Sequence, residues 1–303
     1  MQDEQRIQSN DGSLVSISSI KKRLTRANNS IEKGAFKAAL KILYDIITLT
    51  RADLTNESKL LLADALCSMS QCTYNMHDYN KALECAKEAL LIYESLPYSD
   101  DAFMAKIAWA HQHVGDAFSL SGNIDIAVEH YSKELTIARN LYTNDKLHAS
   151  LLIHALNCMG ARLADQHKYD EALSNIRDSI SIMGVPYKGS AAGRLANLSW
   201  TRHLMGHVLF KMNDNKAALS DLQAAFKMRE QLSIKNKRYL PSLKNTLLLI
   251  GDIYARQMQK EQALIMYNQA LGIICSAYYK KQILTSTSER KSLEEKIKII
   301  KTS

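Results

Sequence analysis

Two tryptophans and two histidines are the side chains of this sequence best suited to specific chemistry. Trp109 and Trp200 are its only tryptophans, and tryptophan is a large, rigid side chain with one donor that is enriched at binding hot spots. His203 and His207 are four residues apart, so on a helix their imidazoles share one face with adequate geometry for a metal ion. No HExxH motif adds a carboxylate to this pair. We therefore interpret both as binding-surface histidines, which titrate between about pH 6 and 7 if unperturbed.

Motifs of enzymes and cofactor sites are missing from the sequence. It contains no GxxxxGKS/T phosphate loop, no GxGxxG after a strand and no GxSxG turn. We expect no catalytic residue, no cofactor and no metal site, and therefore a protein that is not an enzyme. The start of the chain lacks an apolar signal core, and no run approaches the roughly 18 apolar residues of a membrane span. A cytoplasmic protein with reduced thiols is expected, because the five cysteines form no CxxC pair.

A repeated pattern shows which elements must position these side chains. Residues 251–271 contain Gly251, Tyr254, Ala263, Tyr267 and Ala270. Six alanines anchor copies of the pattern at intervals of 43, 45, 45, 46 and 45 residues: Ala39, Ala82, Ala127, Ala172, Ala218 and Ala263. A small residue stands twelve positions before each anchor: Ala27, Ser70, Gly115, Gly160, Gly206 and Gly251. This spacing predicts paired helices that approach closely at the small residues, with the tyrosines filling the space beside them.

The spacing of small, aromatic and alanine residues resembles the tetratricopeptide repeat (TPR) family. At about 45 residues the repeat is similar to the long type found in kinesin light chains, in polarity adaptors that orient mitotic spindles and in bacterial peptide-sensing regulators. The resemblance covers residues 20–280. It implies an all-α fold, a right-handed α-solenoid of about six helix–turn–helix repeats with a C-terminal capping helix, in which the first helices line the concave face.

The repeats divide the sequence into three parts. Residues 1–17 are polar and predicted to be disordered, residues 18–283 to form the solenoid, and residues 284–303 to form a basic capping helix and tail. The repeats are expected at about residues 18–50, 57–95, 101–141, 146–183, 193–232 and 241–279. Asp78, Asn123 and Asp214 occupy N-cap positions at the expected starts of second helices.

Positions that the repeat pattern leaves open are the expected partner contacts. Projected from the anchors, the first helices of repeats two to six present Asp64, Gln71, Tyr74, Asn75, Trp109, Gln112, His113, Asp116, His154, Asn157, Asp165, Trp200, His203, His207, Phe210, Asn245, Asp252 and Arg256. Both tryptophans occupy the same repeat position. Two interpretations of that position stay open, an aromatic anchor for a bound peptide and packing between neighbouring repeats.

The net charge of +8 belongs to the last third of the chain. Residues 211–303 contain 17 lysines and arginines against 8 acidic residues, whereas residues 1–210 contain 22 against 23. Such a field favours acidic partners, and a solvated helical surface with a basic tail explains the same charges.

The sequence therefore predicts a non-enzymatic protein–protein interaction module, an adaptor or scaffold that binds an extended or helical peptide segment of a partner in the groove. One alternative is a peptide-sensing regulatory protein of the bacterial TPR-regulator type. An RNA-binding helical-repeat protein is a weaker alternative, because no aromatic-interleaved pattern accompanies the basic residues.

Overall fold

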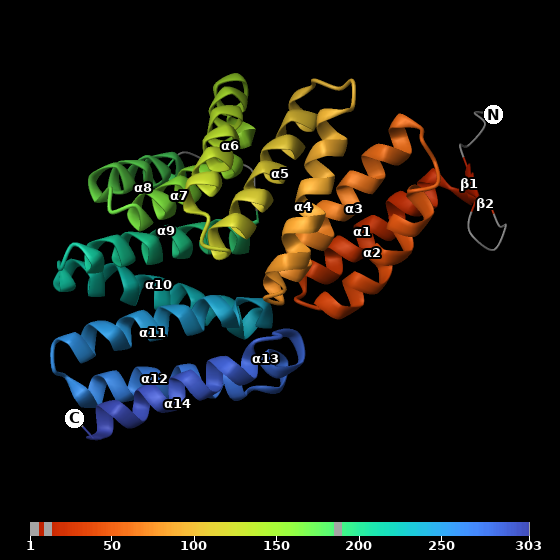
Figure 1. Cartoon of the computed structure of the whole chain (residues 1–303). Coiled ribbons are helices and arrows are strands. Elements are labelled where there is room, and N and C mark those ends of the chain that lie inside the picture. Colours follow the sequence, from red (N-terminus) through yellow and green to blue (C-terminus); the bar gives the residue numbers. More distant parts are fainter. Residues whose placement is uncertain (1–5, 9–13, 185–189, 303) are drawn as a thin grey trace. The chain divides into compact units, whose positions relative to one another are not determined.

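Short turns join consecutive helices into pairs throughout the computed structural model, which describes residues 6–8, 14–184 and 190–302 (Figure 1). The six pairs are α1 (Ile17–Glu32) with α2 (Phe36–Thr50), α3 (Asn56–Asn75) with α4 (Tyr79–Glu94), α5 (Asp101–Leu120) with α6 (Ile124–Asn144), α7 (Ala149–Asp165) with α8 (Tyr169–Met183), α9 (Ala191–Lys211) with α10 (Asn215–Lys235), and α11 (Leu240–Arg256) with α12 (Lys260–Cys275). Two 3₁₀ turns, η1 (Lys146–His148) and η2 (Lys237–Tyr239), precede α7 and α11. The predicted all-α repeat fold is confirmed.

No helix within the described ranges combines the length and apolar character that crossing a bilayer requires.

The chain divides into two compact units, and the division falls within α6, between Ile137 and Ala138. In unit 1, the first helices contact each other in succession, α1 with α3 and α3 with α5. In unit 2, α7 contacts α9, and α9 contacts α11. Each unit therefore has a continuous row of first helices, as the repeat pattern implied.

In the turn inside each pair, the residue at one fixed position has a left-handed backbone conformation. Its φ lies between 61° and 79° at Gly34, His77, Gly122, His167, Asn213 and Met258. These positions recur at the same intervals as the alanine anchors. The N–H of the following residue donates back to a carbonyl five positions earlier, as Gln259 does to Tyr254 at 2.9 Å, which closes the first helix. Four of the six are not glycine, although a left-handed conformation costs such a residue about 1–2 kcal/mol.

Glycine in a first helix lets the second helix press a large side chain against its backbone. A Cβ added at Gly251 would lie 2.6 Å from Cε1 of Tyr267, and one at Gly115 would lie 2.9 Å from Cε1 of Tyr131. Both tyrosines are almost fully buried. The predicted close approach at small residues, with tyrosines beside them, is therefore present in these pairs.

Two of the expected N-caps are present. The Asp78 side chain accepts from the Lys81 N–H at the start of α4. The Asp214 side chain accepts from the Ala217 N–H at the start of α10. Asn123 directly precedes α6.

The N-terminal segment differs from the expectation of disorder over residues 1–17. Strands β1 (Arg6–Gln8) and β2 (Leu14–Ser16) pair antiparallel with Ile7 opposite Val15. Ile7 is only 3% exposed, and β1 lies against α2, so burial of an isoleucine stabilises the pair. Residues 1–5 and 9–13 lie outside the described residues. The available sequence signal was Asp11-Gly12, a dipeptide enriched between paired strands.

Helices α13 (Ala277–Gln282) and α14 (Ser286–Thr302) follow the last pair. Helix α14 packs on α12, and its Leu293 and Ile297 join the core that contains Tyr267. The Glu289 carboxylate accepts from the Lys244 ammonium at 2.7 Å and from the Tyr279 hydroxyl at 2.6 Å. Because Lys244 is on α11 and nearly buried, this cluster fastens both C-terminal helices to the sixth repeat.

Two glycines of the sixth repeat should respond oppositely to alanine. Gly251→Ala forces Tyr267 away from α11, and we expect a loss of about 1–3 kcal/mol of unfolding free energy. Gly272, on α12, has open space around an added Cβ, so Gly272→Ala should gain about 0.5–1 kcal/mol. Thermal and urea unfolding followed by circular dichroism measures both, and the same sign for the two variants would contradict this account of the close approach.

Removing one partner of the Lys244–Glu289 pair should loosen the C-terminal helices. For Glu289→Gln we expect a cost of about 2–3 kcal/mol, below the full value for a buried pair because Glu289 stays one-fifth exposed. Hydrogen exchange should accelerate in α13 and α14. Lys244→Met combined with Glu289→Gln removes the stranded charge and should restore most of the stability. If the double variant has as low an unfolding free energy as the single one, the Lys244–Glu289 ion pair is not the interaction that stabilises these helices.

Candidate partner-binding surface

Helix α9 presents four of the sequence-predicted residues along one face. Trp200, His203, His207 and Phe210 follow each other at steps of three and four residues, and each is half-buried. Most of the residues that α9 buries, including Leu204, lie between them in sequence. Helical periodicity explains the arrangement, because one stripe packs against neighbouring helices while the adjacent stripe stays partly exposed.

Contacts from this face join α9 to the first helices on both sides. The Trp200 ring lies on the His154 ring of α7, with centroids 4.8 Å apart. On the other side, the Arg256 guanidinium of α11 lies 3.9 Å above the Phe210 ring. The Arg256 guanidinium also donates to the Phe210 carbonyl at 3.2 Å and to Asn213 Oδ1 at 3.0 Å. The Trp200 indole therefore packs between neighbouring repeats while part of its surface stays exposed.

The imidazoles of α9 are held neutral by their surroundings. Burial, followed by the Arg229 guanidinium, holds the pKa of His203 well below its usual value. Burial also lowers the pKa of His207, with Lys211 as the next cause. The expected titration between pH 6 and 7 is therefore wrong, and protonation occurs at lower pH. A neutral imidazole has one donor and one acceptor nitrogen, and Nδ1 of His203 already lies 3.3 Å from Thr246 Oγ1.

Arg229 is a functional candidate that the sequence did not reveal. It is 4% exposed, and its guanidinium donates to the Ser242 carbonyl at 2.8 Å and to Thr246 Oγ1 at 2.6 Å. Thr246 Oγ1 also lies 3.3 Å from His203 Nδ1. Burial lowers the pKa of Arg229 to about 9. This network fixes α9, α10 and α11 together beneath the exposed face, and no sequence motif marks it.

The remaining predicted residues of unit 2 have varied surroundings. Asn245 is exposed on α11. Asp165 is exposed and pairs with Arg162 at 3.2 Å. Asp252 accepts from the Tyr267 hydroxyl at 2.6 Å and from the Lys296 ammonium. Asp252 therefore joins three helices before any partner is present.

Two predicted contacts are buried, which corrects their placement on the exposed surface. Asn157 is fully buried and donates to Thr201 Oγ1 of α9 at 2.7 Å. Gln112 is 6% exposed and donates to Asp116. The Asn157 amide binds a polar group of the neighbouring helix, whereas the Gln112 amide binds a carboxylate one turn further along its own helix.

In unit 1 the predicted residues fall into a structural and an exposed group. Asp64 accepts from the Lys106 ammonium at 2.5 Å and from the Tyr93 hydroxyl at 2.6 Å. Asp116 accepts from the Tyr131 hydroxyl at 2.6 Å. These carboxylates join neighbouring helices, as Asp252 does in unit 2.

The other predicted residues of unit 1 are at least partly accessible. Gln71 is exposed, and its carbonyl accepts from the Asn75 amide at 2.6 Å. Tyr74 is half-buried and meets Tyr79 edge-on, with ring centroids 5.8 Å apart. Trp109 and His113 are half-buried on α5. In unit 1, therefore, Gln71 is exposed and Tyr74, Asn75, Trp109 and His113 are partly exposed.

Solved structures are similar to this chain over most of its length. A Rap protein complexed with Competence and Sporulation Factor has a TM-score of 0.63 at 12% identity, covering 93% of this chain and 88% of that chain. NprR in complex with its cognate peptide NprX has 0.62 at 14%, covering 90% and 72%. A putative kinesin light chain of Podosopora anserina with TPR-like repeats has 0.50 at 13%, covering 71% and 97%. No protein-family model and no curated protein matches the sequence.

The chain has the TPR fold. At 12–14% identity these likenesses establish the architecture alone. The half-buried face of α9 lies on a first helix, in the row that α7, α9 and α11 form.

A pair of histidines in the third TPR makes unit 1 sensitive to acid. His111 Nδ1 of α5 lies 3.1 Å from His130 Nδ1 of α6. Burial lowers the pKa of His111 to about 4, with His130 and Lys133 as the next causes. Burial also lowers the pKa of His130, followed by Lys133. One ring donates and the other accepts, so the contact needs a neutral imidazole.

Unit 1 should lose stability as the pH falls from about 6.5 to about 4. In this window the unfolded chain binds a proton at His111 that the folded chain does not, so the free energy of unfolding decreases with falling pH. We expect a fall of about 2 kcal/mol beyond that of His111→Leu, a comparison that cancels the titration of carboxylates common to both. Urea unfolding at a series of pH values measures it, and parallel curves for the two proteins would show that His111 is not the sensitive group.

Proposed function

We propose that this protein is a non-enzymatic interaction module that binds a peptide segment of another protein along its first helices. The observation that carries the proposal is the row of half-buried side chains on α9, Trp200, His203, His207 and Phe210. The row combines two aromatic anchors with two neutral imidazoles, which suits a segment with apolar side chains and exposed backbone polar groups.

The anchors of this row are held in place before a partner arrives. His154 packs on Trp200, and Arg256 packs on Phe210. Side chains that are already ordered lose little rotamer entropy on binding, so more of their contact energy becomes affinity. Exposed Asn245 adds an amide that reads a peptide backbone as both donor and acceptor.

In unit 1 we include Trp109, His113, Gln71, Tyr74 and Asn75 as contacts of the same kind. Asn157 and Gln112 are left out because their amides are buried. Asp64, Asp116 and Asp252 are positioning residues in this proposal, since tyrosine hydroxyls of neighbouring helices already bind them.

The class of ligand is supported by two of the similar structures. The Rap protein and NprR are each in complex with a peptide or factor. The balance of 17 basic to 8 acidic residues over 211–303 adds a preference for acidic segments. We propose an adaptor as the form of this function, in keeping with a sequence that has no enzyme motif.

A peptide-sensing regulator is the second candidate. The observation that favours it is the TM-score of 0.62–0.63 with the Rap protein and NprR, above the 0.50 with the kinesin light chain. A sensor changes shape when peptide binds, whereas an adaptor keeps its shape. Small-angle scattering with and without the captured peptide separates the two. Affinity for single-stranded RNA that falls steeply with salt would instead indicate the RNA-binding alternative.

Truncating Trp200 should weaken capture of the partner. A photo-reactive benzoylphenylalanine at Asn245 should cross-link a protein in the native cell, whereas the same group at exposed Arg177 of α8 should not. Trp200→Ala should lower the cross-linking yield at Asn245 at least about tenfold, because buried aromatic anchors dominate interface energy. Mass spectrometry of the cross-linked peptide identifies the segment.

Trp200→Phe is the matched control, because it keeps a ring against His154. It should retain most of the yield while unfolding at a temperature close to that of the wild type. If Trp200→Ala folds normally and cross-links the same segment with unchanged yield, α9 is not the binding surface.

A further inference from the structure

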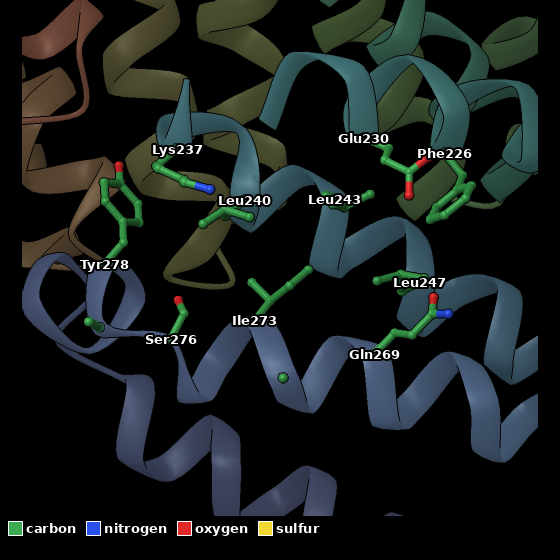
Figure 2. A pocket seen from close by; sticks show the side chains of 12 residues that line it. Phe226, Glu230, Lys237, Leu240, Leu243, Leu247, Gln269, Ile273, Ser276 and Tyr278 are labelled. Atoms are coloured by element: carbon green, nitrogen blue, oxygen red, sulfur yellow. The ribbon is translucent and has the colours of Figure 1, made fainter. Parts of the chain in front are cut away.

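An open, largely apolar groove lies between α10, α11 and α12. Its volume is about 570 Å³, within the range of sites that hold ligands. Figure 2 shows its lining, which comes from these three helices and from the segments η2 and α13 at one end. The lining consists of Phe226, Glu230, Lys237, Leu240, Leu243, Leu247, Gln269, Gly272, Ile273, Ser276, Ala277 and Tyr278.

The lining is ordered along the helices. Phe226 of α10, Leu247 of α11 and Gln269 of α12 lie at one end, and Leu240 and Tyr278 lie at the other (Figure 2). Leu243 and Ile273 lie between the two ends. The lining runs from Leu240 to Leu247 on α11 and from Gln269 to Ser276 along α12, roughly 11 Å in each case at the rise of an α-helix. The groove is therefore elongated and accepts about two turns of a partner helix.

Gly272 keeps one wall of the groove open. Glycines 115, 160, 206 and 251 also lie inside helices, and an added Cβ at each would meet a side chain or backbone of the paired helix. At Gly272 an added Cβ would meet nothing within 4 Å. Packing inside the protein thus does not require this glycine, which lowers the stability of α12 relative to alanine. The absence of a side chain leaves room for an occupant beside the α12 backbone, and a methyl group at this position would still leave most of that room.

The groove has opposite charges at its two ends. Lys237 lies at the end near Tyr278, and Glu230 lies near Phe226 at the other end (Figure 2). Both are exposed. Within the described ranges, neither side chain has a hydrogen-bond or ion-pair partner. A charge pattern of this kind orients a ligand that carries both signs.

Where the lining lies inside the helices, as at Phe226, Leu247 and Gln269, the backbone is paired within the helix, so these walls offer side chains and not backbone groups to a ligand. An extended segment would leave its own N–H and C=O groups unpaired against apolar side chains, which is unfavourable. A helix satisfies its backbone internally and presents an apolar stripe at steps of three and four residues.

We propose that an amphipathic helix of a partner protein docks in this groove, with an acidic residue opposite Lys237 and a basic residue opposite Glu230. The proposal shares with the function above the class of ligand, a protein segment. It uses none of the predicted contacts on α9 and the first-helix face, so either proposal can fail while the other holds.

The test is a selection of peptides against the whole protein. A displayed library of stapled helical peptides of about 12 residues, roughly 18 Å long, is selected on the wild type and counter-selected on Gly272→Phe. Gly272→Phe fills the groove, and Gly272→Ala is the matched control that leaves most of it open. Circular dichroism and thermal unfolding confirm that each variant is folded.

The selected peptides should share apolar residues at three- and four-residue steps between an acidic and a basic end. We expect equal affinity for the wild type and Gly272→Ala, and at least about tenfold lower affinity for Gly272→Phe. Lys237→Glu should weaken binding, and exchanging the acidic residue of the peptide for lysine should restore it. Trp200→Ala should leave these affinities unchanged.

Several outcomes overturn the proposal. One is recovery of no peptide that distinguishes the wild type from Gly272→Phe. Another is a set of peptides that depends on Trp200 and not on Gly272, which assigns the binding to the first-helix surface. A wild-type dimer in analytical ultracentrifugation that Gly272→Phe dissociates would make the occupant a second copy of the chain. If no selective peptide is found and decanoate binds to the wild type but not to Gly272→Phe, the occupant of the groove is a small amphiphilic anion.

Discussion

The close contact between the two helices of a repeat is the constraint on which the structure depends. At Gly115, Gly206 and Gly251 the first helix has no side chain where the second helix presses a tyrosine or leucine against it. The left-handed turn residue recurs at the same intervals, so every pair is closed by the same geometry. A fixed geometry within the pair fixes which stripe of each first helix remains for its neighbours and for a partner.

Contacts within a repeat are visible in the sequence because their residues are only twelve to sixteen positions apart. Gly251, Ala263 and Tyr267 form one packing unit, and the same spacing recurs upstream. The strands β1 and β2 could not be predicted in this way, because a strand of three residues is too short to show a periodic pattern. The division into two units within α6 was invisible for a different reason. The division depends on which residues pack together in space, whereas the repeat pattern of the sequence continues through α6 without a break.

The candidate surface was predictable in part. The open positions of α9 do form a half-buried row, because that row follows from helical periodicity alone. The prediction that Asn157 is exposed is wrong, because Thr201, which is 44 residues later in the sequence, packs against it. The sequence pattern predicts Asp64 and Asp252 as partner contacts, whereas in the structure both carboxylates accept hydrogen bonds from tyrosine hydroxyls. Whether an open position meets solvent or a neighbouring helix depends on packing between repeats, which no spacing within a repeat encodes.

The last helices have a larger role than solvent-facing caps. Helix α11 contributes Asn245 and Arg256 to the first-helix surface and Leu240, Leu243 and Leu247 to the groove. Its position is fixed from one side by Arg229, which binds Ser242 and Thr246, and from the other by the Lys244–Glu289 pair. The second of these contacts comes from α14, and Tyr278 of α13 forms the end of the groove. Because one helix borders both surfaces, the polar cluster that anchors α13 and α14 is a condition for the geometry of each.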